Sequence, residues 1–367
     1  MMKPFNSILN TLVICFLFIA ATSDEGIHLI HADQTIGRMQ NEQKLSIFTG
    51  HVHFRQDTIH MHCDTAVFNR TLNHLDFRGR VYVFDGRNRI RARTIQYDPD
   101  KRSIRCVDSV RIKTDTDSMY AELMYYDLEI DSVFARRNVY LMNTEHQVQV
   151  WGDSGIHHDQ KNYSYVLGRR SRLIKIDTSA ADTLDIRAAR LHYFAGDSAR
   201  ATAVDSVIIY KGALKAAGDT AIYDTDEEIV WLLNHPKAWY EENALSGNRI
   251  KALFDSLQIT DLVVFGRAEA RSRVDSLSDE ENILRGREIY FKIENKKPQR
   301  ILAVQEASSI YYLRNEQNED QGSNFSTADS ILILFTKGEV DSIKIMGGAQ
   351  GVYYPQNYKG DKAFEGQ

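Results

Sequence analysis

The sequence predicts an all-β protein built from antiparallel strand pairs that repeat in series along the chain. Three observations carry this prediction. Apolar and polar residues alternate over most of the chain, the same strand-pair pattern recurs at a nearly constant spacing, and signals for helix starts and ends are scarce. With 367 residues, 43% of them hydrophobic and only five prolines, the chain has ample material for a β-rich core.

The clearest strand pair spans residues 59–84. Its first half alternates, changes phase at Asp64 and then alternates again, which is the pattern of a half-buried strand with one irregularity. A polar turn at 69–71 follows, and the second alternating run contains Gly79, which predicts a bulge or bend. One strand pair cannot bury its apolar face alone, so this pair requires neighbours.

The same pattern recurs from about Leu29 onward. In each copy, a run of alternating apolar and polar residues leads to a small or acidic residue, and an aromatic or apolar residue follows. After a polar turn, a second alternating run ends in the motif small-x-Val, where x is any residue. The residues at the acidic position are Asp33, Asp64, Arg93 and Glu122, so successive spacings are 31, 29 and 29 residues. A fixed period in this range indicates a stacked array of one supersecondary unit, and we expect about ten units and roughly twenty strands.

The chain begins with a short basic segment and an apolar stretch that ends in small residues. This is the composition of a signal peptide cleaved after Ser23, so residues 1–23 are expected to be removed and the mature chain exported. An uncleaved membrane anchor is the alternative, although the apolar stretch is shorter than the ~20 residues of a membrane-spanning helix.

A polar connector at 177–183 is long enough to act as a hinge and predicts two lobes. We expect a first set of β repeats over residues 24–177 and a second over residues 178–355, with more divergent repeats after residue 273. Residues 356–367 lack the periodicity and predict a flexible tail. Further connectors of this kind are expected at 274–282 and at 314–327, the latter as a mobile loop.

The sequence lacks the common motifs of catalytic and cofactor sites. It contains no Gly-x-Ser-x-Gly elbow, no phosphate-binding loop, no His-Glu-x-x-His and no Cys-x-x-Cys. The net charge is −5, and the two signs of charge are interleaved, so there is no basic face for nucleic acid. We therefore assign no catalytic residue, no metal and no cofactor, and we expect neither an enzyme nor a nucleic-acid-binding protein.

Histidines are concentrated in one region. His51 and His53, and likewise His60 and His62, are two residues apart, so each pair projects from one face of a strand. A metal site built from these four residues is geometrically conceivable. The alternative, which we favour, is that they lie on a solvent-facing strand face without a ligand.

The recurrent acidic residue is interpreted as structural rather than catalytic. It lies at the phase shift of each unit, and Arg93, Asn248 and Arg287 replace it in other units. These features are typical of a residue that tolerates a bulge and bonds nearby backbone. The acidic residues concerned are Asp33, Asp64, Glu122, Asp153, Asp219 and Asp329.

Two cysteines remain once the leader is removed. Cys63 lies on the first strand of its unit, and Cys106 lies on the second strand of the next unit. A disulfide between them is possible if the strand register brings them together. The alternative is two buried free thiols that behave as small core residues.

The serial pattern of a small-acidic-x-aromatic strand followed by Gly-x-Val, behind an export signal, resembles the OstA-like family of lipopolysaccharide-transport proteins of the LptA and LptD type. The resemblance covers residues from about Leu29 to Ala270 and then fades, and residues 236–238 and 266–268 depart from the pattern. The segments that carry the resemblance are 30–33, 50–52, 63–68, 79–81, 121–127 and 218–224.

The resemblance implies a V-shaped β-jelly-roll whose two sheets enclose an apolar groove. The implied function is a periplasmic bridge that carries the acyl chains of lipopolysaccharide or a related glycolipid toward the outer membrane, in association with the inner or outer membrane. The residues that would line this groove are Ile59, Met61, Ala66, Phe68, Leu75, Phe77, Val81, Val83, Ile90, Ala92 and Tyr97. A closed, dry core is the alternative for these residues.

The strands at the two ends of such an array would be unpaired, so other lipopolysaccharide-transport components, or a second copy of the chain, could add a strand there. The alternative function, from another class, is an exported structural β-solenoid spacer or adhesin without a lipid ligand.

Overall fold

The computed structural model describes residues 27–358 except 57, 85, 87–88, 99, 128, 131, 145–146, 159–160, 162, 178–181, 195–199, 225–226, 256–257, 275–279, 316–318, 337 and 357. The described residues form 24 β-strands and no helix, which confirms the predicted all-β fold. None of the described segments is a helix with the length and apolar character needed to cross a membrane. The predicted signal peptide and most of the predicted tail lie outside the described residues.

The chain divides into two compact units, the first comprising residues 1–181 and 187–201 and the second residues 182–186 and 202–367. The predicted bounds of the repeat segments, 24–177 and 178–355, stay predictions. The strands of the first unit are β1 (His28–His31), β2 (Gln34–Gln40), β3 (Gln43–Gln56), β4 (Ile59–Asn69), β5 (His74–Phe84), β6 (Arg89–Asp98), β7 (Ser103–Lys113), β8 (Asp117–Asp127), β9 (Ser132–Asn143), β10 (Val148–His158), β11 (Tyr163–Asp177) and most of β12 (Asp182–Phe194).

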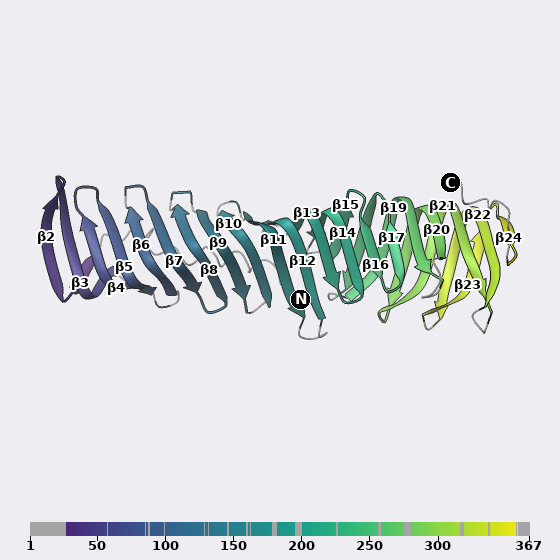
Figure 1. The fold of residues 1–367 in the computed structure, drawn as a ribbon, viewed down its shortest axis with the longest axis horizontal. Helices are drawn as coiled ribbons and strands as arrows, with labels where there is room; N and C mark the ends of the chain where they lie inside the picture. Colours follow the sequence, from purple (N-terminus) through teal and green to yellow (C-terminus); the bar gives the residue numbers. More distant parts are fainter. Residues whose placement is uncertain are drawn as a thin grey trace. The chain divides into compact units, whose positions relative to one another are not determined.

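The strands of the second unit follow in chain order (Figure 1). They are most of β13 (Arg200–Lys211), β14 (Leu214–Asp224), β15 (Ile229–Leu233), β16 (Lys237–Tyr240), β17 (Asn243–Ser246), β18 (Arg249–Asp255), β19 (Gln258–Arg273), β20 (Glu281–Glu294), β21 (Lys297–Arg314), β22 (Asp320–Thr336), β23 (Glu339–Met346) and β24 (Gln350–Tyr354).

In the first unit, each strand from β3 to β11 pairs antiparallel with the next, so the sheet grows in chain order. β1 and β2 both pair with β3, one along each half of its length. The predicted strand pair at 59–84 is therefore confirmed as β4 and β5, joined by a turn after Asn69. Strand pairs in series are the architecture that the 29-residue period predicted.

The long strands of the first unit are bent near their middle. Phe48 and Phe54 lie six residues apart on β3, and a straight strand would separate their Cα atoms by about 20 Å. Their ring centroids are only 5.2 Å apart, in an edge-to-face contact. β3 therefore folds back on itself, and its two halves, which we call the two arms, face each other across a shared core.

A pair of residues with left-handed backbone conformation lies at the bend of every second strand of this unit, namely β3, β5, β7 and β9. The first two pairs are Gly50–His51 and Gly79–Arg80, and the next two lie at 108–109 and 137–138, so the spacing is 29 residues in each case. The register between neighbouring strands shifts at the same places, for instance between Arg78 and Val81 of β5. The bulge predicted from Gly79 is confirmed. Glycine is favoured at such a position because it has no Cβ to clash at positive φ.

The recurrent acidic residue contacts the bend of the next strand. Asp64 accepts hydrogen bonds of 2.9 and 2.6 Å from the Arg80 guanidinium, and this contact lowers the pKa of the Asp64 carboxyl. Asp33 accepts one of 2.9 Å from His51 Nδ1. Asp153 accepts a hydrogen bond from the Arg169 backbone N–H at 3.2 Å, which is the backbone contact that we expected. The recurrent acidic residue therefore makes structural contacts, and these are chiefly with side chains.

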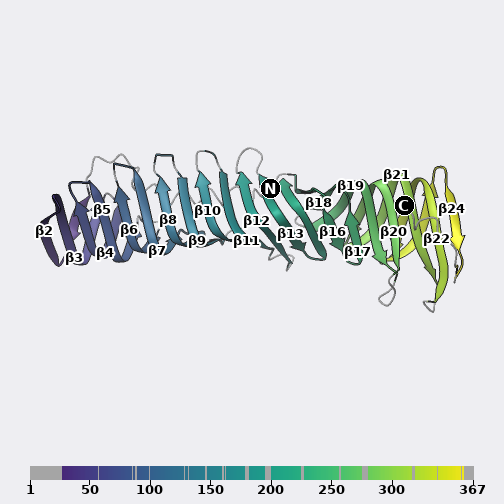
Figure 2. The same ribbon diagram turned by 45° about the horizontal axis from the view of Figure 1, so that its top comes forward.

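The number of strands agrees with the roughly twenty strands that we expected. Four long strands are interrupted at the bend and appear as the pairs β1/β2, β15/β16, β17/β18 and β23/β24, each pair lying along one partner strand. The 24 strands thus correspond to twenty passes of the chain. Figure 2 shows β17 and β18 beside their shared partner β19.

The second unit keeps the bend in a more varied form. Left-handed pairs occur at 205–206, 234–235, 266–267, 305–306 and 347–348. Pro236 follows the second of these pairs and lies in the break between β15 and β16, which is why its segment departs from the repeat pattern. The prediction of a mobile loop at 314–327 is wrong beyond residue 319, because β22 begins at Asp320 and pairs with β24.

Cys63 and Cys106, the two cysteines among the described residues, are buried and free. Burial raises the pKa of the Cys106 thiol to about 12 and, opposed by backbone hydrogen bonds, raises that of Cys63 to about 11. Both side chains belong to the buried core cluster of this unit, as the second of our two alternatives expected.

We expect Gly79→Ala to destabilise the first unit. A Cβ at this position would lie 2.5 Å from Asp64 Oδ2, and φ is +73°. The left-handed conformation alone costs a non-glycine residue about 1–2 kcal/mol, and displacing Asp64 adds to it. Chemical denaturation measures the loss. The matched control is Gly37→Ala on β2, where a Cβ meets nothing within 4 Å; an equal loss in both variants would contradict the bend as the cause.

The cysteines should resist alkylation in the folded protein. Because thiolate is the reactive form and the pKa of both thiols is raised, iodoacetamide at pH 8 should label the native chain slowly and the urea-unfolded chain at the rate of free cysteine. Mass spectrometry under non-reducing conditions measures the extent of labelling at each of the two cysteines. A 63–106 disulfide in the exported protein, or equal labelling rates in the two states, would show that the buried free thiols are not the native state.

Candidate functional site

The candidate site is the apolar space between the two arms of the first unit. One cluster of buried side chains runs through this space from β3 to β9, because the phase of each strand shifts at its bend and so turns apolar residues of both arms inward. Phe54 of β3, for example, packs edge-to-face on Phe77 of β5 at 5.8 Å. We call this space the trough.

The residues predicted to line a groove all lie in the trough. Phe68, Val83 and Tyr97 are half-buried and pack against the cluster. The other eight are buried, with exposed fractions between 1% and 7%, namely Ile59, Met61, Ala66, Leu75, Phe77, Val81, Ile90 and Ala92. The sequence therefore located the inward face of these strands. Whether this face contacts a ligand stays a prediction.

A cavity lies at the mouth of the trough, where the strand tips of the two arms face each other. Ile59, Val83 and Ile90 come from the tips of one arm, and Tyr97 and Ile104 come from the tips of the other. The cavity measures about 40 Å³. A water molecule occupies about 30 Å³ in the liquid, so the mouth admits a very small group. A smaller cavity of about 20 Å³ lies where Met119, Val133 and Val139 of the same cluster meet β10 and β11.

The lining of the mouth includes residues that sequence reasoning missed. Ile27, Ile95, Ile104 and Cys106 belong to it, together with Gln56 as its polar member. Ile95, Ile104 and Cys106 lie on β6 and β7, the strand pair that follows the one on which the prediction was centred. Continuing the alternation into the next repeat would have found them. The contribution of Ile27 depends on how the chain before β1 folds back and has no local signal.

A second hollow lies on the outer face of the same strands. It measures about 640 Å³ and is lined by four arginines, Arg80, Arg91, Arg93 and Arg111, with Asp64 at one side. The guanidinium of Arg91 lies over the Tyr82 ring at 5.4 Å, and that of Arg111 lies over Tyr120 at 5.6 Å. This open, cationic surface differs in chemistry from the trough and is unsuited to hydrocarbon.

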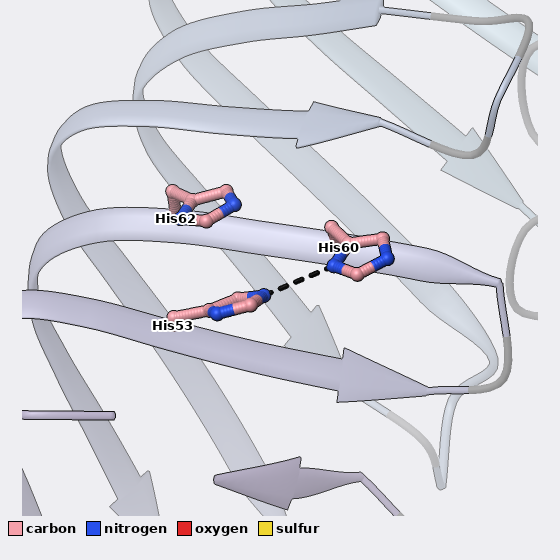
Figure 3. A group of neighbouring side chains, drawn as sticks. All are labelled: His53, His60 and His62. Carbon is pink, nitrogen blue, oxygen red and sulfur yellow. Dashed lines mark hydrogen bonds between the residues drawn. The ribbon is translucent and has the colours of Figure 1, made fainter. Parts of the chain in front are cut away.

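The structure brings together three of the four histidines that the sequence singled out. His53, His60 and His62 converge on the outer face of β3 and β4, whereas His51 lies at the bend and bonds Asp33 (Figure 3). Desolvation, followed by the charges of the neighbouring imidazoles, lowers the pKa of His53 and of His62. The metal site of four histidines that we considered is therefore not assembled, but a group of three is.

The fold and the trough define a class of protein: repeated β-strand pairs, bent so that two arms enclose an apolar core. Within that class, residues 24–134 match the model of the family described as OstA-like protein, which confirms the predicted resemblance for this segment. From residue 135 to Ala270 the resemblance stays a prediction.

Fifteen chains of solved structures match this chain. One of them is LptH from Pseudomonas aeruginosa, described as the LptA homologous periplasmic component of the conserved lipopolysaccharide transport device. The match has 12% sequence identity and a TM-score of 0.21, and it covers 39% of this chain and 79% of LptH. None of the curated protein sequences matches significantly.

The two faces of β5 should respond differently to truncation. Phe77 is 3% exposed in the trough, so Phe77→Ala should cost about 3–5 kcal/mol of the free energy of unfolding. Phe84, on the outer face of the same strand, has Arg89 over its ring at 5.7 Å. Phe84→Ala should cost about 1 kcal/mol or less, since it loses chiefly this cation–π contact. Urea denaturation measures the free energy of unfolding of both variants. A larger loss for Phe84→Ala than for Phe77→Ala would contradict the assignment of the core to the face of β5 that carries Phe77.

Proposed function

We propose that this chain is a periplasmic bridge of a lipopolysaccharide-transport system and holds glycolipid acyl chains between the arms of its first unit. The observation that carries the proposal is the apolar trough with its mouth at the strand tips, located within the segment that matches the OstA-like family. The chain would act as a carrier without catalysis and would pass glycolipid toward the outer membrane.

Binding requires the arms to separate at the mouth. The cavity of about 40 Å³ is far smaller than an acyl chain, so an entering chain must displace side-chain contacts between the arms. Each methylene that leaves water contributes about 0.8 kcal/mol, and several chains can therefore offset the contacts that are lost. The bends stay in place during this motion because they lie at the closed side of the trough, where Gly50 and Gly79 set the strand direction.

The end strands of the chain support the proposed partners. β2 is exposed along its whole length, and Ile36 and Met39 are 41% and 64% exposed. Among the described residues β2 pairs only with β3, so one of its edges is open to another strand. A further transport component, or a second copy of this chain, would extend the sheet here through main-chain hydrogen bonds.

A second candidate function is an exported structural spacer that binds no lipid. The filled trough favours it, because side chains such as Ala66 and Val81 are 1% exposed. In that case the residues of the trough are core only, and the series of strand pairs serves as a rigid support.

The two functions make different predictions for one pair of variants. Val83 lies at the mouth, and Val67 lies on the outward side of β4 beside Asp76. Val83→Lys should weaken binding of a fluorescent fatty-acyl probe at least tenfold, because a charged side chain at the mouth must be desolvated before a chain can enter. Val67→Lys should leave binding unchanged. Probe titration measures both variants after circular dichroism confirms that they are folded.

Photo-crosslinking in cells identifies the lipid. A photo-crosslinking residue in place of Phe68 should yield a glycolipid adduct in exporting cells, and the same residue in place of Val67 should not. A protein that purifies without lipid, binds no acyl probe and gives no adduct from Phe68 is the spacer, and this result would end the proposal of a carrier.

A further inference from the structure

The outer face of β3 and β4 carries a histidine group that the proposed carrier function does not use. His60 and His62 are two residues apart on β4, and Met61 between them is 7% exposed and faces the trough. The alternation of side chains along a strand therefore directs both imidazoles outward. His53 is the register partner of His62 on the neighbouring strand, so a third imidazole joins them on the same face.

The three imidazoles lie close together on this face (Figure 3). Each offers one ligand atom, and these atoms all lie within 4.8 Å of one another. His53 Nε2 and His60 Nδ1 are 3.0 Å apart and share a hydrogen bond. Two nitrogens bound to one tetrahedral ion at about 2.0–2.1 Å are themselves about 3.3 Å apart. One pair therefore already has nearly the separation that a shared ion imposes.

The imidazole of His62 needs only a side-chain rotation to join the other two in binding an ion. His53 and His62 are stacked, with centroids 4.2 Å apart and an angle of 16° between the ring planes. Rings in this arrangement must turn about χ2 for their nitrogens to point at one ion. The χ2 torsion of histidine is broad, and His62 is exposed on its outer side. The backbone register, which decides which residues of the two strands face each other, already places His53 beside His62.

We infer that His53, His60 and His62 bind one transition-metal ion of the Zn²⁺, Cu²⁺ or Ni²⁺ type. Three neutral imidazoles without a carboxylate suit these ions and not Mg²⁺ or Ca²⁺, which prefer oxygen ligands. Three protein ligands leave a fourth position for a water molecule. The ion would tie β3 to β4 on the face opposite the trough, so this inference does not depend on the lipid that the trough holds.

The neighbouring side chains refine the expected chemistry. Arg55 is the register partner of His60, and its positive charge lowers the affinity for a cation. On the other side, His31 is the register partner of His53 and lies 3.2 Å from Asp33, so a carboxylate is held one strand away. Arg55→Gln should therefore strengthen metal binding, which is a change that a site elsewhere on the protein would not show.

The test is metal titration of the exported chain, purified without an affinity tag. Zn²⁺ should bind at one ion per chain by calorimetry, and Co²⁺ in its place should give the intense visible absorption of a tetrahedral nitrogen site. His53→Gln and His62→Gln should each weaken Zn²⁺ by at least the roughly 10–100-fold that the loss of a second-shell partner costs. The control is His74→Gln on β5, a histidine of the same unit that lies beside Asp76 at 3.6 Å.

Each outcome decides the inference. Weaker binding in both variants, with His74→Gln unchanged and Arg55→Gln tighter, supports it. No binding of Zn²⁺, Cu²⁺ or Ni²⁺ by the native chain overturns it, and so does binding that survives replacement of all three histidines or that falls equally in the His74→Gln control. His53 is half-buried and stacks on His62, so the variants are first compared with the native chain in thermal unfolding without metal, and a variant that does not unfold cooperatively is replaced by His60→Gln.

Discussion

The bend in each long strand is the constraint on which the rest of the structure depends. A straight sheet of this length would leave one apolar face in water, and nothing else in the described chain could cover it, since the described residues form no helix. A left-handed residue pair such as Gly79–Arg80 lies at the bend of every second strand of the first unit, and the strands fold back there so that the two halves of one sheet cover each other. The neighbouring carboxylate of Asp64 then holds the bend through Arg80. In this repeat, Asp64 and the Gly79–Arg80 pair thus act together at the bend.

The bend also makes core and candidate site the same set of residues. Phe77 and Val81 stabilise the first unit by packing between the arms, and these are the side chains that an acyl chain would contact. A tightly packed core is stable but leaves no room, while an open groove exposes apolar area to water. The structure lies near the closed extreme and leaves its small cavity at the strand tips, farthest from the bend. Opening at that side breaks the fewest contacts with the bend.

The outer face shows what alternation and register produce together. A single row of paired residues crosses every strand from β3 to β11, and it consists largely of aromatic, histidine and arginine side chains. The row runs through His53, His62, Tyr82, Arg91, Arg111, Tyr120, Tyr140, Trp151 and Arg172. Stacking along this row, such as Tyr140 on Trp151 at 5.2 Å, stabilises neighbouring strand pairs without any burial in the trough.

The sequence by itself determined the strand pairs, their period, the inward face and the bend at Gly79, because each follows from the side-chain alternation of a strand or from the conformational freedom of one residue. It also favoured isolated surface histidines. Only the tertiary structure decided that His53 meets His60 and His62 while His51 turns to Asp33. Cross-strand contacts depend on register, and the register shifts between Thr49 and Val52, at the bend that contains His51. The same is true of the trough: alternation shows which side chains face inward, but only the angle between the arms decides how much space remains among them.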